Sequence, residues 1–192
     1  MFYIKDKNKY QALVIGGSAG SFPVINRILE SLTPGYRLPL IMCLHRLKDK
    51  REGFQEALRI KSKLPVSEPD DKSPIEHGNA YVAPANYHLL VEKPGLFALA
   101  TTELVQYSRP SIDVLFESAA DVYQDRLIAL LVSGANRDGA YGMYKVKKAG
   151  GLCVVQDPEE CGMATMPEAA IKATRIDHVL PVEKIIELLQ SV

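Results

Sequence analysis

Cysteine is scarce in this chain, and the spacing of its cysteines argues against a fold held together by disulfides or by a structural zinc ion. The 192 residues include three cysteines, and no two form a C-x-x-C pair. Cys43 and Cys153 lie within apolar runs, as is typical of small buried residues, while Cys161 falls in a predicted loop. An odd number of cysteines without metal-site spacing argues against a disulfide framework and a structural zinc site, and favours a reducing compartment.

Three further absences narrow the class of protein. Lysine plus arginine equals aspartate plus glutamate, at 23 each, so no basic excess indicates a nucleic-acid partner. No apolar run approaches the ~20 residues that a membrane helix needs. Residues 1–7 lack the apolar core of a secretory signal. We therefore expect a cytoplasmic protein without nucleic-acid binding or membrane insertion.

The pattern of apolar runs predicts one α/β domain over residues 1–192. Hydrophobic residues make up 47% of the chain and charged residues 24%, as in an ordinary globular protein, and no repeat or linker is visible. Nearly continuous apolar runs alternate with helical patterns, which is typical of strands buried on both faces of a parallel sheet. These strands are predicted at residues 11–15, 38–44, 127–132 and 152–155. The prediction is a doubly wound, mostly parallel sheet with helices on both faces.

Apolar periodicity also predicts the helices and the remaining strands. Helices are expected at about 24–32, 52–64, 112–123, 140–148, 168–173 and 182–189, and short strands at 66–68 and 177–180. Between residues 75 and 102 the period changes to short strand-like runs at 80–83, 87–91 and 96–100. Lys93-Pro94-Gly95 is a hairpin turn signal between the last two. We expect this region to be an antiparallel hairpin extension of the parallel sheet.

The most informative stretch follows the first predicted strand. Gly16-Gly17-Ser18-Ala19-Gly20 has the G-x-S-x-G spacing of a nucleophile elbow, in which glycines allow a sharp turn that exposes a serine. The G-x-G-x-x-G spacing of a dinucleotide-binding turn is not met.

Three of the most apolar strands are followed by residues with triad chemistry. Ser18 follows the first strand and His45 the second, and the loop after the third contains Asp138. The carboxyl ends of parallel strands form one edge of the sheet, where sites of open α/β folds lie. A serine needs a base to take its proton, and a carboxylate orients the imidazole that does so. The order Ser, His, Asp differs from the Ser, Asp, His order of α/β-hydrolases.

Each of these residues also has a structural interpretation. Ser18 fits a helix N-cap or turn, His45 fits a hydrogen-bonded loop residue, and Asp138 fits a cap of the helix that follows it. His88 is a second candidate base. Arg109-Pro110-Ser111 fits a capping segment, with Ser111 at the helix N-cap, or the rim of a substrate groove.

Six motifs follow one another along the chain: Gly16–Gly20, Leu44-His45, Ala83–Leu89, Arg109–Phe116, Ser133–Ala140 and Thr165–Ala169. In this order they resemble the catalytic domain of chemotaxis protein-glutamate methylesterases of the CheB type. The resemblance runs from about residue 10 to the end of the chain.

The resemblance implies hydrolysis of γ-glutamyl methyl esters, and deamidation of glutamines, on chemoreceptor-like proteins. Ser18 would be the nucleophile, His45 the base and Asp138 its orienting carboxylate, with the main-chain N–H of Ala135 as oxyanion donor. No metal or cofactor is implied.

The chain departs from the family pattern at several positions. These are Ala19, Ser21, Leu44 and Asn136-Arg137. The family's usual receiver domain is also not found in the sequence, so the expectation is either constitutive activity or control by a separate, phosphorylation-dependent regulator. These departures motivate an alternative, a catalytically weakened protein-binding module of the same fold in a signalling complex. A nucleotide-binding domain is a third interpretation, which rests on fold analogy alone.

Overall fold

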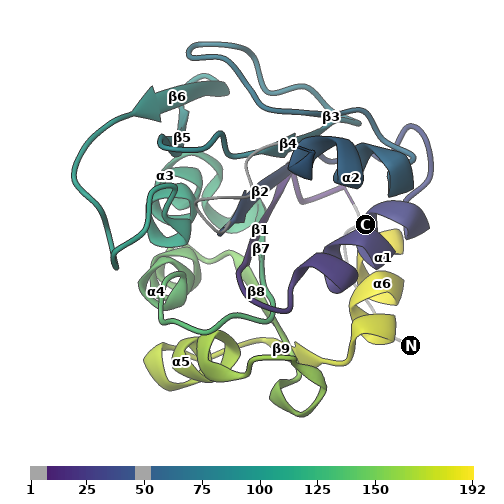
Figure 1. Ribbon diagram of the computed structural model, residues 1–192, viewed down its shortest axis with the longest axis vertical. Helices are drawn as coiled ribbons and strands as arrows, with labels where there is room; N and C mark the ends of the chain where they lie inside the picture. The colour runs from purple at the N-terminus through teal and green to yellow at the C-terminus, as the bar shows by residue number, and fades with distance from the viewer. Residues whose placement is uncertain (1–7, 46–52) are drawn as a thin grey trace.

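Residues 8–45 and 53–192, which the computed structural model describes, form a seven-stranded sheet with helices on both faces (Figure 1). Every strand pairing in this sheet is parallel. In spatial order the strands are β3 (Val66–Ser67), β4 (Ala80–Val82), β2 (Leu40–Leu44), β1 (Ala12–Gly17), β7 (Leu127–Leu131), β8 (Leu152–Gln156) and β9 (His178–Leu180). The doubly wound, mostly parallel fold expected from the sequence is confirmed.

Helices cover the sheet in two groups, which Figure 1 shows on its right and left sides. One group comprises α1 (Phe22–Ser31), α2 (Phe54–Lys61) and α6 (Val182–Gln190). The other comprises α3 (Ile112–Tyr123), α4 (Ala140–Lys148) and α5 (Thr165–Ala173). Helix α5 begins three residues earlier than predicted, and the predicted start of α2 at residue 52 lies outside the described residues. No helix in the described part of the chain is both long and apolar enough to cross a membrane.

Alternation along β1 gives the molecule two apolar cores, one on each face of the sheet. Leu13 and Ile15 pack with α1 and α6, while Ala12 and Val14 pack with α3. All six residues of β1 are buried, as expected for a central strand with neighbours β2 and β7. Because β1 lies between β2 and β7, the elbow that follows it can be hydrogen-bonded by the main chain at the ends of both neighbours.

The predicted hairpin is present, but it forms a sheet of its own. Strands β5 (His88–Glu92) and β6 (Leu96–Ala100) pair antiparallel with each other and with no strand of the seven-stranded sheet. Residues 80–82, which we grouped with this antiparallel region, instead form β4 and pair in parallel with β2 and β3. The hairpin is attached to the body through side chains, since Leu89, Val91 and Phe97 belong to the core beneath α3, and through main-chain hydrogen bonds of Phe97 with residues 72 and 73.

Gly16 brings the N-terminus of α3 close to the end of β1. A Cβ atom at Gly16 would lie 2.4 Å from Ile112 Cγ2 and 2.8 Å from Leu131 Cδ1. Both distances are shorter than any normal carbon contact, so a side chain here would push α3 away from the sheet.

We predict that Gly16→Ala lowers the free energy of unfolding by about 1–3 kcal/mol because it overpacks this contact. The urea unfolding midpoint measures the change. Gly162→Ala is the matched control, since its Cβ would lie at an ordinary 3.5 Å from Gly20 Cα. Equal midpoints for the two variants would contradict the close approach of α3.

Candidate active site

Ser18 occupies a tight turn between β1 and α1. Its N–H donates to Ser133 O at 2.9 Å, which ties it to the end of β7. Its carbonyl oxygen accepts from Ser21 N at 3.0 Å and from Ser21 Oγ at 2.6 Å, which closes the turn. Gly20 has φ +79°, a conformation that glycine adopts without strain. Ser21 is at the N-cap of α1, but its hydroxyl fixes the turn instead of capping the helix.

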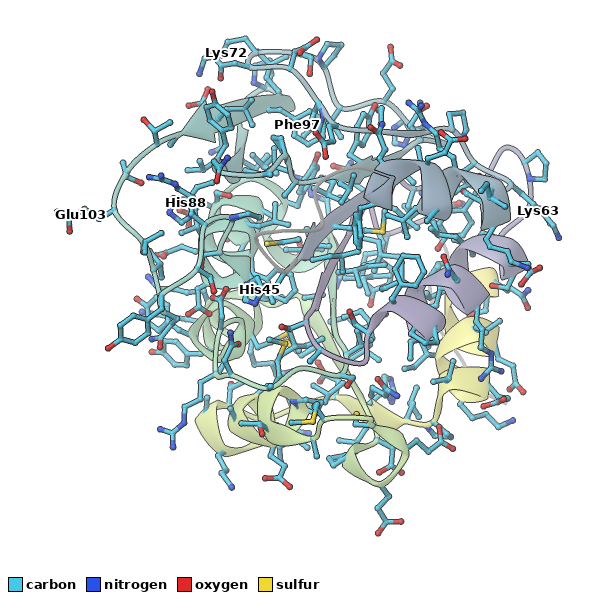
Figure 2. All side chains as sticks on the ribbon, in the orientation of Figure 1. His45, Lys63, Lys72, His88, Phe97 and Glu103 are labelled. Atoms are coloured by element: carbon cyan, nitrogen blue, oxygen red, sulfur yellow. The ribbon has the colours of Figure 1, made fainter. Side chains whose placement is uncertain are left out.

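His45 stands beside Ser18 at the end of the neighbouring strand. Its N–H donates to Gly17 O at 3.0 Å, which continues the pairing of β2 with β1. Its side chain is only 11% exposed. Figure 2 shows it near the centre of the view, on the side of the sheet that carries α3 and α4. The strand ends therefore bring the predicted nucleophile and base to adjacent positions.

Asp138 is fully buried and accepts four hydrogen bonds. Oδ1 accepts from Ser111 Oγ at 2.8 Å and from Asp113 N at 3.0 Å. Oδ2 accepts from Ile112 N at 2.7 Å and lies 2.8 Å from His45 Nε2. Asp138 thus caps a helix, but the helix is α3 and not the predicted α4, whose N-cap is Gly139.

The pKa of Asp138 shows that these contacts favour the carboxylate. Burial alone raises the pKa, but hydrogen bonds from His45, Asp113 N and Ile112 N outweigh it and place the pKa below its ordinary value. An ionised carboxylate only accepts hydrogen bonds. His45 Nε2 therefore carries a hydrogen, and in the neutral ring Nδ1 holds the lone pair that can accept a proton.

Ser18 and His45 are neighbours without being hydrogen-bonded to each other. Within residues 8–45 and 53–192, no hydrogen bond joins Ser18 Oγ to His45. The contact at Nδ1 is instead Asn136 Nδ2, at 3.3 Å. Catalytic hydrogen bonds are often long in enzymes without bound substrate and tighten when it binds.

The main chain before Asp138 offers a donor near this site. Gly134 N donates to Met163 O at 3.0 Å, and Gly134 O accepts from Met166 N at 2.9 Å, which fixes the peptide before Ala135. Ala135 itself is exposed, and its N–H makes no hydrogen bond to any residue of the described ranges. This free N–H suits a developing oxyanion.

Asp113 accepts hydrogen bonds at the start of α4, just as Asp138 does at the start of α3. Its Oδ1 accepts from Gly139 N at 2.9 Å and from Gly142 N at 2.7 Å, at the start of α4. The aspartate of α3 therefore caps α4, while the aspartate before α4 caps α3. Burial, together with the nearby Asp138 charge, raises the pKa of Asp113 to about 6 despite these hydrogen bonds.

Ser133 joins the three loops around the site. Its hydroxyl donates to Ala19 O at 2.8 Å and accepts from Met163 N at 2.9 Å, and its N–H donates to Gln156 Oε1 at 3.0 Å. The sequence reasoning assigned no role to Ser133, Asp113 or Asn136. All three lie within the motifs that resemble the family, but the residues they bond to are mostly distant in sequence, and no sequence pattern indicates which residues these are.

His88, the second candidate base, bonds the main chain with both ring nitrogens and so has a structural role. It is fully buried; its Nε2 lies 2.9 Å from Glu103 O, and its Nδ1 lies 3.2 Å from Ser111 N. Arg109 donates to the carbonyls of Thr101 and Thr102, so it closes the loop before α3. Figure 2 shows His88 inside the molecule and Glu103 at its edge. Both nitrogens of His88 are occupied, which leaves His45 as the candidate base.

Metal ligation finds no support in the part of the chain described. No three histidine, cysteine, aspartate or glutamate side chains there are grouped so that they could hold a metal ion. None of the three cysteines is in a disulfide bond, and Cys43 and Cys153 are buried as predicted.

The family model described as CheB methylesterase matches residues 13–189. The chain belongs to the CheB methylesterase family. The match spans the elbow, His45 and the Asp138 loop, so the three strand ends of the site all fall inside the family domain.

Two comparisons illustrate this membership. A Leptospira interrogans protein assigned the name protein-glutamate methylesterase/protein-glutamine glutaminase is 47% identical over 182 residues, or 93% of each chain. The crystal structure of the Thermotoga maritima CheB methylesterase catalytic domain matches with a TM-score of 0.89 and 30% identity, over 94% of this chain and 97% of that one. The full Thermotoga maritima protein, a protein-glutamate methylesterase/protein-glutamine glutaminase, is matched over 52% of its length.

We predict that Asp113→Asn changes how stability depends on pH. Asp113 has a pKa of about 6 in the folded chain, against 3.8 as its ordinary value. The folded chain therefore holds a proton between these values that the unfolded chain has lost, and stability falls as pH rises through this window. Asparagine keeps an acceptor for Gly139 N and Gly142 N but does not ionise.

The stability of Asp113→Asn relative to wild type should thus increase by on the order of 2 kcal/mol from pH 4 to pH 7. Urea unfolding at pH 4, 5.5 and 7 measures it. A difference that stays constant with pH would refute the prediction.

Proposed function

We propose that the chain is a serine hydrolase that removes methyl groups from γ-glutamyl methyl esters, and deamidates glutamines, on chemoreceptor-like proteins. The single observation that carries the proposal is the adjacency of Ser18, His45 and Asp138 at the ends of β1, β2 and the loop after β7. Membership of the CheB methylesterase family supports the substrate class.

In the first half-reaction, Ser18 Oγ attacks the ester carbonyl carbon while His45 Nδ1 takes the hydroxyl proton. Asp138 holds the ring with Nδ1 facing away from it and stabilises the imidazolium that forms. The Ala135 N–H would donate to the oxyanion, a contact whose loss typically costs ~10²–10³ in turnover. Collapse of the intermediate breaks the bond to methoxide, which leaves as methanol with the proton from His45.

In the second half-reaction, water hydrolyses the γ-glutamyl ester of Ser18. His45 takes a proton from the attacking water and returns it to Ser18 Oγ as the glutamate carboxylate is released. A glutamine substrate follows the same steps with ammonia as the leaving group. These steps use only the side chains and main chain described, together with water.

The surroundings of Ser18 support a retained nucleophile despite the departures from the family pattern. Ser21, at a usual glycine position, closes the turn through its bonds to Ser18 O. Ala19 contributes its carbonyl to Ser133, an interaction that needs no side chain. Leu44 is buried in the core as an ordinary strand residue.

The proposal includes a cytoplasmic location, where the receptor segments that such an enzyme modifies are accessible. It also includes one catalytic domain over residues 1–192, working constitutively or under a separate phosphorylation-dependent regulator.

We predict that purified protein releases methanol from methylated receptor and that Ser18→Ala abolishes the release, because the variant lacks the hydroxyl that attacks the ester. Methanol release from receptor carrying a radiolabelled methyl group measures the activity. Ser73→Ala, at a partly exposed loop serine whose hydroxyl donates to Asp70 O, is the control and should retain full activity.

Methanol release that survives Ser18→Ala would overturn the triad. The alternative of a binding module without turnover makes a different prediction. In that case folded wild-type protein would bind receptor but release no methanol, and Ser18 would not react with a fluorophosphonate.

A further inference from the structure

Asn136 makes two hydrogen bonds that together define the orientation of its side-chain amide. Oδ1 accepts from Asp138 N at 3.1 Å, a local turn in which a side chain bonds the main chain two residues on. Nδ2 then faces His45 Nδ1 at 3.3 Å. Since the oxygen is already engaged with a donor, the group directed at His45 is the N–H.

The ring nitrogen that Asn136 contacts is the one with the lone pair. Asp138 only accepts hydrogen bonds, so His45 Nε2 carries the hydrogen between them. Neutral imidazole has one lone pair in the ring plane, on the other nitrogen. Asn136 Nδ2–H therefore donates to the lone pair of Nδ1.

The same lone pair must accept the proton of Ser18 in the reaction. It cannot accept from Asn136 and from Ser18 in one geometry. Ser18 and His45 are already adjacent in the main chain, and the hydrogen bond that Nδ1 makes is the one to Asn136.

We propose that Asn136 is a positioning residue that occupies the proton-accepting nitrogen of His45 until substrate is bound. The inference rests on the proposed triad. Asn136 is half-buried and lies between the exposed residues Ala135 and Arg137, where a bound polypeptide can reach it. A carbonyl oxygen of the substrate accepts from Nδ2, the amide turns from the ring, and Nδ1 becomes available to Ser18. Availability of the base is thereby coupled to occupancy of the site.

Asn136→Ser tests this directly. Serine keeps an oxygen for Asp138 N, but its hydroxyl is too short to reach His45. Labelling of Ser18 by a small alkyl fluorophosphonate should become about three- to tenfold faster, the range expected for one released hydrogen bond. Turnover of methylated receptor should gain less, because receptor already displaces Asn136. A side chain that only stabilised the fold would not separate the two reactions.

Two further variants sharpen the comparison. Asn79→Ser is the matched control, because Asn79 Nδ2 bonds a main-chain oxygen, His77 O, just before β4 at the opposite end of the sheet. Its labelling rate should equal that of wild type. Asn136→Asp keeps the oxygen for Asp138 N but places a carboxylate beside Nδ1, which favours the imidazolium. Its labelling should be slower at pH 7, with the acid limb of the rate profile at higher pH.

A spectroscopic readout is independent of catalysis. The chain has four histidines, so the ¹⁵N resonances of selectively labelled histidine are few enough to assign by substitution. The Nδ1 resonance of His45 should shift in Asn136→Ser towards that of a nitrogen without a hydrogen bond, and stay in place in Asn79→Ser.

The outcomes separate the two proposals. Labelling of folded Asn136→Ser at or below the wild-type rate, or an unshifted Nδ1 resonance, overturns the role of Asn136. Labelling or turnover that persists in Ser18→Ala overturns the triad instead, whatever Asn136 does. If Asn136→Ser does not fold, faster or unchanged labelling of Asn136→Asp at pH 7 overturns the role of Asn136, and slower labelling supports it.

Discussion

The arrangement of the site depends on the hydrogen bonds that the buried carboxylate of Asp138 accepts. It joins the N-terminus of α3, the hydroxyl of Ser111 and the ring of His45 in one buried cluster. A buried carboxylate is stable only when its charge is compensated, and here helix N–H groups provide that compensation. Asp113 repeats the arrangement at the start of α4. The two helices are fixed to each other at the same point where the candidate base is oriented.

This dual role changes how substitutions of Asp138 should be interpreted. Removing the carboxylate takes away an orienting group for His45 and also leaves two N–H groups at the end of α3 without a partner. Such unpaired groups cost stability in their own right. Loss of activity in an Asp138 variant therefore mixes chemistry with folding, whereas Ser18 makes no comparable contact with its side chain in the described residues.

Much of the fold and the location of the site could be predicted from the sequence, because apolar runs mark buried strands and parallel strands end at one edge. That rule places Ser18, His45 and Asp138 at one edge, and the family resemblance favours a triad over the structural interpretation of each residue. The partner of Asp138 does not, because it caps a helix that begins 26 residues earlier in the chain. The isolation of β5 and β6 was also not predictable, since alternation indicates a strand but not its neighbour. Asn136 was visible only as a departure from a family motif.

The hairpin β5–β6 has a consequence for how the chain tolerates changes in length. Its strands share no main-chain hydrogen bonds with the seven-stranded sheet, so its register is set by its own turn, by the main-chain hydrogen bonds between residues 95–97 and 72–75, and by its packing on α3. An insertion or deletion at residues 93–95 shifts β5 against β6 and leaves β1, β2 and β7 in alignment. In a central strand, a one-residue slip would instead turn every side chain to the opposite face. Changes in the hairpin therefore reach the three strand ends through side chains, such as the hydrogen bond from Ser111 N to His88 of β5, and not through the pairing of the seven-stranded sheet.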